Sequence, residues 1–321
     1  MLIHGAMLLM PGEKRSQVKK SQNNSVKKVD KISYTPYKFL APTIAAMLLL
    51  MGYPLVNNVW LAFQRKNLLT PNKTGFYGFG NFAAIFADKD IPMIAWHTLI
   101  FVVCTVGLQF FLGFGLAMVL RKPFRGRKLY QSIVFVPWAF SGMIVGLIFK
   151  WLFNGEFGAV NDILLKLNLI SQKISFLGSS SLALMVVILA LVWVGVPFFA
   201  IMILAALQSI PSSLYEAADI DGAGSFTKFF SITLPFIKPT IIMTLLLRTI
   251  WVFNNADMIY VITQGGPGNS THTLSSYLYA KSLSSLDFGY TAALGLIFMI
   301  GLAIYASIVI RVTNYEEAGD F

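Results

Sequence analysis

Four side chains that form ionic or strong hydrogen bonds lie close together inside one long apolar stretch: Arg248, Asn254, Asn255 and Asp257. Arg248 and Asn255 are seven residues apart, so a continuous helix would place them on one face, about 10 Å apart along its axis. Asp257 would lie on the opposite face, out of reach of Arg248. A guanidinium binds carboxylate or phosphate through parallel hydrogen bonds. This grouping therefore indicates a site for a polar ligand.

The cost of placing Arg248 in such a stretch requires an explanation. An arginine near the middle of a membrane span costs about 2.5–3.5 kcal/mol on insertion scales. An anionic ligand in an aqueous cavity would offset this cost. A structural pair with a carboxylate or carbonyl of another chain would do the same, as would extension of the side chain toward the cytoplasmic interface. The sequence leaves these three interpretations open.

The composition identifies the setting of these residues. The chain has 321 residues, of which 56% are hydrophobic and 12% charged, whereas soluble domains carry about 25% charged residues. This excludes a soluble enzyme and a disordered scaffold. With one cysteine, Cys104, and three histidines without metal-ligand spacing, we expect no metal site. No nucleophile lies next to a general base, so we expect no catalytic residue.

Six apolar stretches are long enough to cross a bilayer, which takes about 20 helical residues. They are residues 39–63, 93–120, 129–153, 182–207, 240–263 and 290–310. The ten-residue segments of alternating polarity that are typical of membrane β-barrels do not occur. The predicted fold class is therefore all-α, a polytopic bundle of about six transmembrane helices.

Basic residues predict the orientation of the bundle, because cytoplasmic loops are enriched in Lys and Arg. Eight lie in residues 1–38 and five more in residues 121–128, which predicts that both termini are cytoplasmic. We expect residues 1–38 to be a disordered basic tail that contacts anionic lipid headgroups, residues 39–313 to be the membrane domain, and residues 314–321 to be a second cytoplasmic tail. Without accompanying aromatic residues, the charge does not indicate nucleic-acid binding.

The long cytoplasmic loop inside the bundle, residues 208–239, has a pattern of its own. A helix is predicted to begin after Pro211, with Ser212 or Ser213 as its N-cap and Glu216 in its first turn. Gly222 is expected to end this helix. A second amphipathic helix follows, with apolar residues at helical spacing: Phe226, Phe229, Phe230 and Ile232. Such a helix–turn–helix at the membrane surface can dock into a groove of a partner.

This loop resembles the EAA loop of the permeases of bacterial ABC importers. The matching residues are Glu216, Ala217, Ala218, Asp221, Gly222, Ala223, Phe229, Ile232, Leu234 and Pro235. In that family the loop forms the coupling helix, which sits in a groove of the ATP-hydrolysing subunit. The resemblance implies that Glu216 bonds a basic group of that subunit and that Gly222 permits the turn.

The stretch after Trp251 resembles the carbohydrate-uptake branch of these permeases, and within it the first permease of maltose- and lactose-type systems. The markers are Gly265, Gly266, Pro267, Thr271, Thr273, Tyr277, Tyr279, Phe288, Gly289, Ala292 and Ala293. The resemblance implies a type I importer core in the bacterial inner membrane. It also implies a heterodimer with a sister permease, two copies of an ATP-binding subunit and a periplasmic solute-binding protein.

ATP and Mg²⁺ are expected on the partner subunit, with no cofactor in this chain. A phosphate-binding Walker A loop needs a glycine directly before its lysine. Here Thr227 precedes Lys228 in the nearest sequence, GAGSFTK. The chain is therefore expected to be a transport subunit and not an enzyme.

The resemblance also implies where substrate binds. In maltose-type permeases the sugar is held near mid-membrane by the fourth and fifth helices of this core. The positions that align through the loop are Gly195, Phe198, Arg248 and Asn255. Phe198 offers an aromatic face for a sugar ring, and Arg248 departs from the neutral-sugar pattern. We hypothesise that Arg248 meets an anionic group, such as the carboxylate of a uronate-containing oligosaccharide.

Two other functions fit parts of this pattern. A permease for glycerol phosphate or another small anion would use Arg248 equally well. A self-sufficient ion-coupled transporter would need carboxylates inside the spans, and only Asp257 qualifies. Four aromatic residues either line a sugar path or anchor the helices at the membrane interface: Trp138, Trp193, Trp251 and Tyr260.

Overall fold

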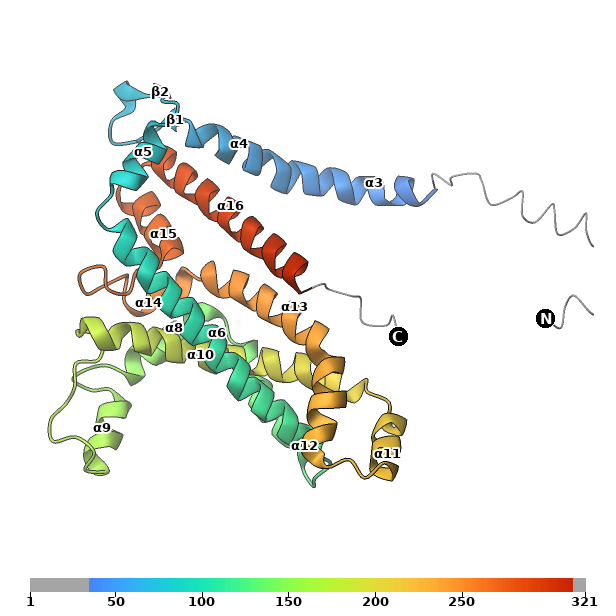
Figure 1. The fold of residues 1–321 in the computed structure, drawn as a ribbon. Helices are drawn as coiled ribbons and strands as arrows, with labels where there is room; N and C mark the ends of the chain where they lie inside the picture. Colours follow the sequence, from blue (N-terminus) through green and yellow to red (C-terminus); the bar gives the residue numbers. More distant parts are fainter. Residues whose placement is uncertain (1–34, 314–321) are drawn as a thin grey trace, which may run out of the picture. The chain divides into compact units, whose positions relative to one another are not determined.

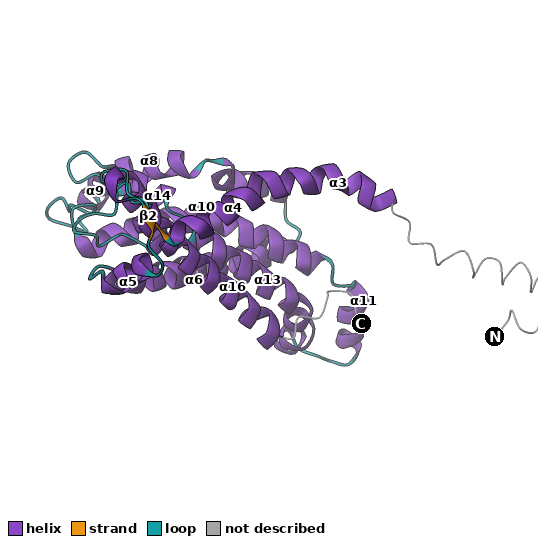
Figure 2. Ribbon diagram, turned by 90° about the horizontal axis from the view of Figure 1, so that it is seen from above, coloured by secondary structure: helices purple, strands orange, loops and turns teal. Residues whose placement is uncertain are grey.

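The computed structural model describes residues 35–313, which are almost entirely helical (Figure 2). The predictions for residues 1–34 and 314–321 lie outside the described residues. The α-helices are α3 (Thr35–Met47), α4 (Tyr53–Ala62), α5 (Gly80–Ala87), α6 (Ile91–Arg121), α7 (Arg127–Phe135), α8 (Gly142–Leu152), α9 (Ala159–Lys166), α10 (Ser180–Gln208), α11 (Ser212–Ile220), α12 (Ser225–Lys228), α13 (Leu234–Phe253), α14 (Asp257–Ile262), α15 (Leu274–Ser284) and α16 (Phe288–Val312). Shorter elements are the antiparallel strands β1 (Gln64–Arg65) and β2 (Gly75–Phe76), the 3₁₀ turns Pro71–Lys73 and Val136–Ala139, and the π turns Leu48–Gly52 and Phe229–Thr233.

The described residues divide into two units, residues 35–57 and 58–313. The helical segment Tyr37–Ala62, which includes most of α3 and all of α4, is long and apolar enough to cross a membrane. Its most apolar window contains no buried residue. An apolar helix with outward-facing side chains is expected to be covered by lipid or by another chain.

Four further segments pass the same test of length and hydropathy: Ile91–Arg121, Ser180–Gln208, Ser225–Phe253 and Phe288–Val312. The predicted continuous helix over residues 129–153 is wrong. It is split into Arg127–Ala139 and Gly142–Leu152, which are bent by 94°. The break follows Pro137, and Ser141 caps the new helix by accepting the Ile144 N–H. The described residues therefore contain five spans, or six if this bent pair crosses as one.

The predicted helix over residues 240–263 is also interrupted. Helix α13 ends at Phe253, and α14 begins at Asp257. At the end of α13 the Ile250 carbonyl oxygen accepts from the Asn254 side chain at 2.9 Å and from the Asn254 backbone N–H at 3.1 Å. Asn255 therefore lies in a break after the helix that carries Arg248. The expected common helical face of Arg248 and Asn255 is wrong.

The core of the second unit forms where α6, α10 and α13 pack together. Helix α10 is the most buried of the candidate spans, with 67% of its most apolar window buried. Gly113 of α6 permits close contact with α10, because an added Cβ would lie 2.5 Å from the Phe199 Cβ and 2.9 Å from the Val196 carbonyl oxygen. In Figure 1, α6 runs from the α5 end of this unit toward α11 and α12.

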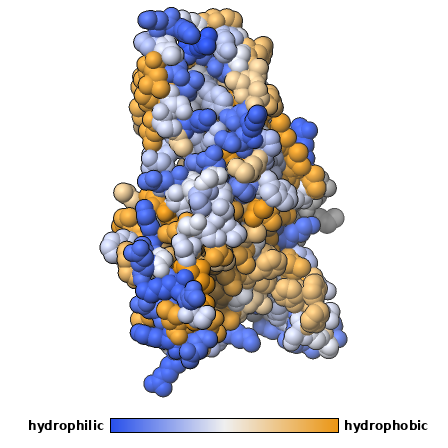
Figure 3. All heavy atoms as spheres, turned by 90° about the vertical axis from the view of Figure 1, so that its left-hand side faces the viewer, coloured by the Kyte–Doolittle hydropathy of each residue, from blue (hydrophilic) through white to orange (hydrophobic). Residues whose placement is uncertain are grey.

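A smaller apolar cluster surrounds the first turns of α16. It contains Ile85, Ile94, Tyr277, Ala293 and Leu294, and so joins α5, α6 and α15 to α16. Figure 3 views the end of the unit that carries β1, β2, α5 and α9, and it shows hydrophilic residues (blue) spread among apolar ones (orange). This mixed surface is the end that the sequence places on the periplasmic side.

Candidate functional site

The loop between α10 and α13 folds as a separate short helix, α11, as predicted from its sequence. Pro211 occupies the N-cap position and the helix begins at Ser212, so Glu216 lies in the second turn and not in the first. Gly222 has a φ of +74°. Its N–H donates to the Asp219 carbonyl, and the next N–H, of Ala223, donates to the Ala218 carbonyl. This pair of bonds is a Schellman motif, which requires a left-handed residue and so favours glycine.

The residues of the EAA-like pattern divide into two groups by exposure. Exposed residues are Glu216, Ala217, Asp221, Gly222 and Pro235. Half-buried residues are Ala218, Ala223, Phe229, Ile232 and Leu234. The first group is accessible to another chain, and Ile232 of the second packs against the main core. The EAA-like pattern therefore contains exposed residues that another chain can contact and half-buried residues that pack against the rest of the bundle.

Sequence analysis missed the contacts that attach α11 to the bundle. The Tyr215 hydroxyl lies 2.8 Å from Thr233 Oγ1, at the base of the helix that carries Arg248. The guanidinium of Arg121, the last residue of α6, lies 4.7 Å from the Tyr215 ring centroid. Asp219 pairs with Lys228. Helix α11 is therefore in direct contact with α6 and with the helix that continues as α13.

Three of the four predicted substrate residues meet in the interior of the bundle. Arg248 Nε donates to Gln109 Oε1 of α6 at 2.6 Å, and the Arg248 Cζ lies 5.7 Å from the Phe198 ring centroid. Gly195 provides space for the pair. A Cβ at this position would lie 2.2 Å from Gln109 and 2.3 Å from Arg248 Nη2. Gln109 was not predicted, because a single glutamine in an apolar run gives no sign of a partner 139 residues away.

Arg248 is buried without an opposite charge in the described part of the chain. The ion pairs found there are Lys228–Asp219 and Lys281–Asp88. The guanidinium instead has a neutral amide as its hydrogen-bond partner. A neutral amide cannot balance the charge of the guanidinium, so the site has an unbalanced positive charge within the described residues. Such a charge is costly to bury in a low-dielectric interior.

The aromatic surface beside Arg248 differs from the prediction. Phe198 is 3% exposed, so its ring offers little free surface to a ligand. Trp138 and Trp251 cover it, with ring centroids 6.1 and 5.2 Å away. They are 47% and 49% exposed in this chain. The accessible aromatic faces of the cluster are therefore those of the two tryptophans.

Asn255 lies apart from the Arg248 cluster in hydrogen bonding. Its Oδ1 is buried and has no hydrogen-bond partner within residues 35–313. An unsatisfied buried acceptor costs about 1–3 kcal/mol. A hydroxyl donor of a bound sugar would satisfy it, which is consistent with the predicted role of this residue.

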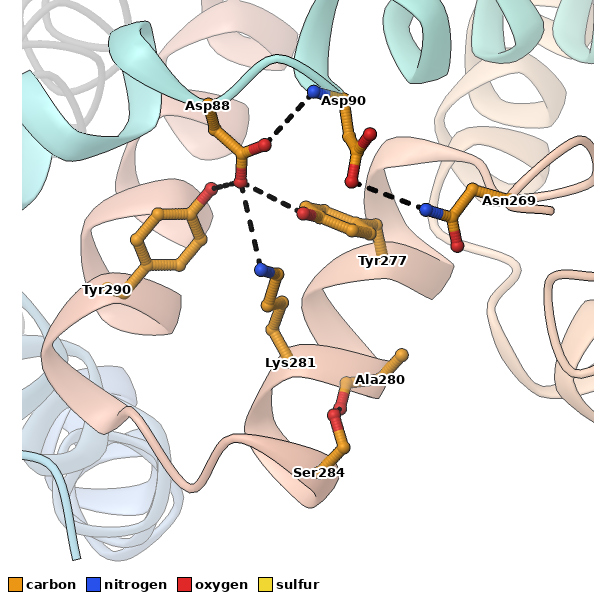
Figure 4. A network of polar contacts seen from close by, with 8 residues as sticks. All are labelled: Asp88, Asp90, Asn269, Tyr277, Ala280, Lys281, Ser284 and Tyr290. Carbon is orange, nitrogen blue, oxygen red and sulfur yellow. Dashed lines mark hydrogen bonds and ion pairs between the residues drawn. The ribbon is translucent and has the colours of Figure 1, made fainter. Parts of the chain in front are cut away.

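A second polar cluster joins the α5–α6 corner to α15 and α16 (Figure 4). Asp88 accepts the hydroxyls of Tyr277 and Tyr290 at 2.9 and 2.8 Å. It also accepts the Asp90 backbone N–H at 3.0 Å, and Lys281 Nζ lies 3.8 Å away. Burial alone would raise the pKa of Asp88, but the N–H, both hydroxyls and the Lys281 charge together lower it. Burial and the Asp88 carboxylate raise the pKa of Tyr277.

The glycine-rich marker sequence forms a tight turn beside this cluster. Gly265 has a φ of +85°, and a Cβ there would lie 2.0 Å from the His272 ring. Burial lowers the pKa of His272, and its Nδ1 lies 3.1 Å from the Ser276 hydroxyl. The Asn269 side chain donates to Asp90 at 3.3 Å. Asn269, which lies between the marker residues, therefore joins the loop between α14 and α15 to the start of α6.

The spans, the exposed helix after α10 and the buried cationic site define a multi-pass membrane permease subunit. A family model described as "Binding-protein-dependent transport system inner membrane component" matches residues 109–313, and the chain belongs to this family. It is 38% identical over 278 residues to the sulfoquinovosyl glycerol transport system permease protein SmoG of Agrobacterium fabrum, covering 87% of this chain and 90% of that protein. It is 32% identical to the trehalose/maltose transport system permease protein MalF of Thermococcus litoralis, covering 88% of this chain and 94% of that protein.

A solved structure supports the fold. A chain of a bacterial ABC transporter involved in the import of the acidic polysaccharide alginate matches with a TM-score of 0.78 and 24% identity, covering 91% of this chain and 99% of that chain. The predicted all-α permease fold and the resemblance to carbohydrate-uptake permeases are therefore confirmed.

Proposed function

We propose that this chain is one permease of a binding-protein-dependent carbohydrate importer and works by alternating access. Residues 39–313 form the membrane domain, residues 208–239 its coupling loop, and both termini are cytoplasmic. A sister permease completes the translocation path, and a periplasmic solute-binding protein delivers the sugar. Two copies of a separate subunit bind ATP and Mg²⁺ and hydrolyse the ATP. The observation that carries this proposal is the folding of the EAA-like loop into an exposed helix ended by Gly222.

The contacts of α11 suggest how ATP binding would reach the substrate site. Closure of the ATP-binding subunits would carry α11 with them. Tyr215 connects α11 to Arg121 on α6 and to Thr233 below α13, and these two helices carry Gln109 and Arg248. For this coupling to work, the inward- and outward-open bundles must differ in affinity for the ATP-bound partner.

Gly222→Pro in the assembled importer tests the coupling. Proline cannot adopt a φ near +74°, so the turn after α11 is disrupted while the spans still insert. ATP hydrolysis should lose its stimulation by sugar-loaded binding protein. Gly224→Pro is the matched control, because Gly224 has a φ of −66° and open space around an added Cβ. Normal stimulation in an assembled Gly222→Pro complex would refute the coupling role.

We further propose that the substrate is an acidic sugar read by Arg248, such as a uronate-containing oligosaccharide. The unbalanced charge of the guanidinium supports this, because charge-assisted hydrogen bonds to carboxylates or sulfonates are about twice as strong as neutral ones. SmoG, whose name specifies a sulfonated glycoside, is among the similar proteins. MalF, whose name specifies neutral disaccharides, is also similar, so the family alone does not determine charge.

Uptake by the reconstituted importer separates the candidate substrates. The panel contains a uronate disaccharide, maltose, sulfoquinovosyl glycerol and glycerol phosphate, each with and without ATP. Uptake without ATP would favour an ion-coupled transporter, and uptake of glycerol phosphate alone would favour a small-anion permease. Arg248→Ala should abolish the preference for acidic ligands. Unchanged uptake of acidic sugars by this variant would refute the role of Arg248.

A further inference from the structure

We infer that Gln109 is the positioning residue that orients the Arg248 guanidinium while leaving it charged, and so determines the preference of the site for anions. This inference rests on the proposed role of Arg248 in substrate recognition. Gln109 is completely buried on α6, and it is the hydrogen-bond partner of Arg248 within the described residues.

Two contacts fix the orientation of the Gln109 amide. Its Nε2 donates to the Leu191 carbonyl oxygen of α10 at 2.7 Å, and its Oε1 accepts from Arg248 Nε at 2.6 Å. The reversed amide would place two acceptors together on one side and two donors on the other. The Leu191 carbonyl of α10 therefore holds the amide in one orientation. In this orientation Gln109 Oε1 is a fixed acceptor for Arg248 Nε.

This contact leaves the two terminal nitrogens of the guanidinium without a hydrogen-bond partner in the described residues. A guanidinium has five N–H groups, and the hydrogen bond found in residues 35–313 uses the one on Nε. Gly195 lets Nη2 approach the α10 backbone, since a Cβ there would lie 2.3 Å from it. The two terminal nitrogens are the pair that binds a carboxylate in parallel geometry.

The neutrality of Gln109 determines the charge of the site. A carboxylate at this position would accept the same hydrogen bond, but it would also cancel the positive charge. Coulomb interactions between unit charges strengthen as the effective dielectric falls, so an internal acid would compete directly with an anionic substrate. A glutamine holds the guanidinium in place without this competition.

The rival explanation is that Gln109 only joins α6 to α10. A joining role predicts equal losses for acidic and neutral ligands, and losses that do not depend on Arg248. A positioning role predicts a change in charge preference that disappears when Arg248 is absent. The two roles therefore differ in selectivity as well as in total transport.

The test uses Gln109→Glu and Gln109→Leu, alone and combined with Arg248→Met, in the complete importer. Uptake of sulfoquinovosyl glycerol, a uronate disaccharide and maltose is normalised to the amount of assembled complex. Gln109→Glu should raise the concentration for half-maximal uptake of the two acidic ligands about tenfold or more, as expected for the loss of one charge-assisted interaction. Gln109→Leu, which retains the charge, should have a smaller effect. In the Arg248→Met background neither substitution should change acidic uptake further.

Two results would overturn the inference. The first is an acidic-to-neutral preference in Gln109→Glu and Gln109→Leu equal to that of the unaltered protein. The second is an equal effect of the Gln109 substitutions with and without Arg248. Failure of the proposed function looks different: Arg248→Met alone would then take up acidic ligands normally.

Discussion

Two charged side chains of this permease, Asp88 and Arg248, differ in the partners that surround them. Asp88 accepts two tyrosine hydroxyls and a backbone N–H, and Lys281 balances its charge. Arg248 has one neutral hydrogen-bond partner, Gln109, and no acidic neighbour in the described residues. Partners within the chain therefore satisfy the charge of Asp88, whereas the charge of Arg248 has no opposite charge among the described residues.

This difference is the basis for proposing that Asp88 is a structural charge and Arg248 a binding charge. The Asp88 cluster connects the α5–α6 corner to α15 and α16, and its bonds leave little capacity for a ligand. Breaking such a network leaves unsatisfied groups behind, which costs more than the average hydrogen bond. The Arg248 site instead carries a charge whose burial nothing in the described chain offsets. A site of this kind gains free energy when an anion enters it.

The largest predicted effect comes from filling the space beside Arg248. Gly195→Ala places a Cβ 2.2 Å from the Gln109 amide and 2.3 Å from Arg248 Nη2. These atoms are ends of side chains, so we expect them to move while the helices stay packed. Acidic-ligand uptake should fall about tenfold or more, corresponding to at least ~1.4 kcal/mol. The control is Gly107→Ala on α6, where an added Cβ meets nothing within 4 Å. Equal uptake by both variants would remove Gly195 from the site.

The next prediction compares stability at the two charges. Asp88→Asn keeps the size of the side chain but weakens its bonds to both tyrosines and to Lys281, so we expect a loss of about 1–3 kcal/mol. Arg248→Met removes a buried charge that has no opposite partner in the described residues, which is favourable, but it also leaves the buried Gln109 Oε1 without its donor. These effects oppose each other, so the loss of stability should be smaller than for Asp88→Asn. Unfolding of the purified chain in detergent measures both. A larger loss for Arg248→Met would mean that its charge is structural, and the contrast between the sites would fail.

The spans and their interruptions differ in how far the sequence predicts them. Hydropathy finds long apolar segments, so four of the predicted spans, residues 39–63, 93–120, 182–207 and 290–310, agree with the structure to within a few residues. It does not detect the breaks at Pro137 and Asn254, because both lie within runs that remain apolar on average. At the second break the side chain and the backbone N–H of Asn254 both donate to the Ile250 carbonyl oxygen, a local arrangement that average hydropathy does not register. The prediction that Arg248 and Asn255 share a face failed for this reason.

The candidate site was partly predictable. Arg248 is conspicuous because a charge inside a span is costly, and Gly222 is conspicuous because it follows a short amphipathic helix. Gln109 and Tyr215 are not conspicuous, since their roles arise from partners brought close only by folding. Gly195 was expected to contact sugar, and in the structure it makes room for Gln109 and Arg248. A sequence shows which residue types are unusual, but not which distant residue satisfies them.

A pH dependence sharpens the assignment of Asp88 as a structural charge. The pKa of Asp88 is lowered in the folded chain, so its contribution is fully present above the unfolded value of about 3.9. The contribution is lost as the pH falls through the lower folded value. The stability difference between the unaltered protein and Asp88→Asn should therefore be constant from pH 7 to about 5 and shrink below about 4. A difference that shrinks already between pH 7 and 5 would assign the effect to another group.

The smallest predicted effect concerns the hydrogen bond between Tyr215 and Thr233 at the cytoplasmic end. It tests whether this bond only stabilises the bundle, as the Asp88 cluster does, or also transmits movement. Tyr215→Phe removes the hydroxyl bond to Thr233 and keeps the ring against Arg121, so the loss of stability should be about 0.5–1.5 kcal/mol. If the link transmits movement, stimulation of ATP hydrolysis by loaded binding protein should also fall about twofold. The matched control is Tyr130→Phe, since Tyr130 is half-exposed, with its ring against Phe124. A stability loss with unchanged stimulation would place Tyr215 with Asp88, among the groups that hold the bundle together without taking part in transport.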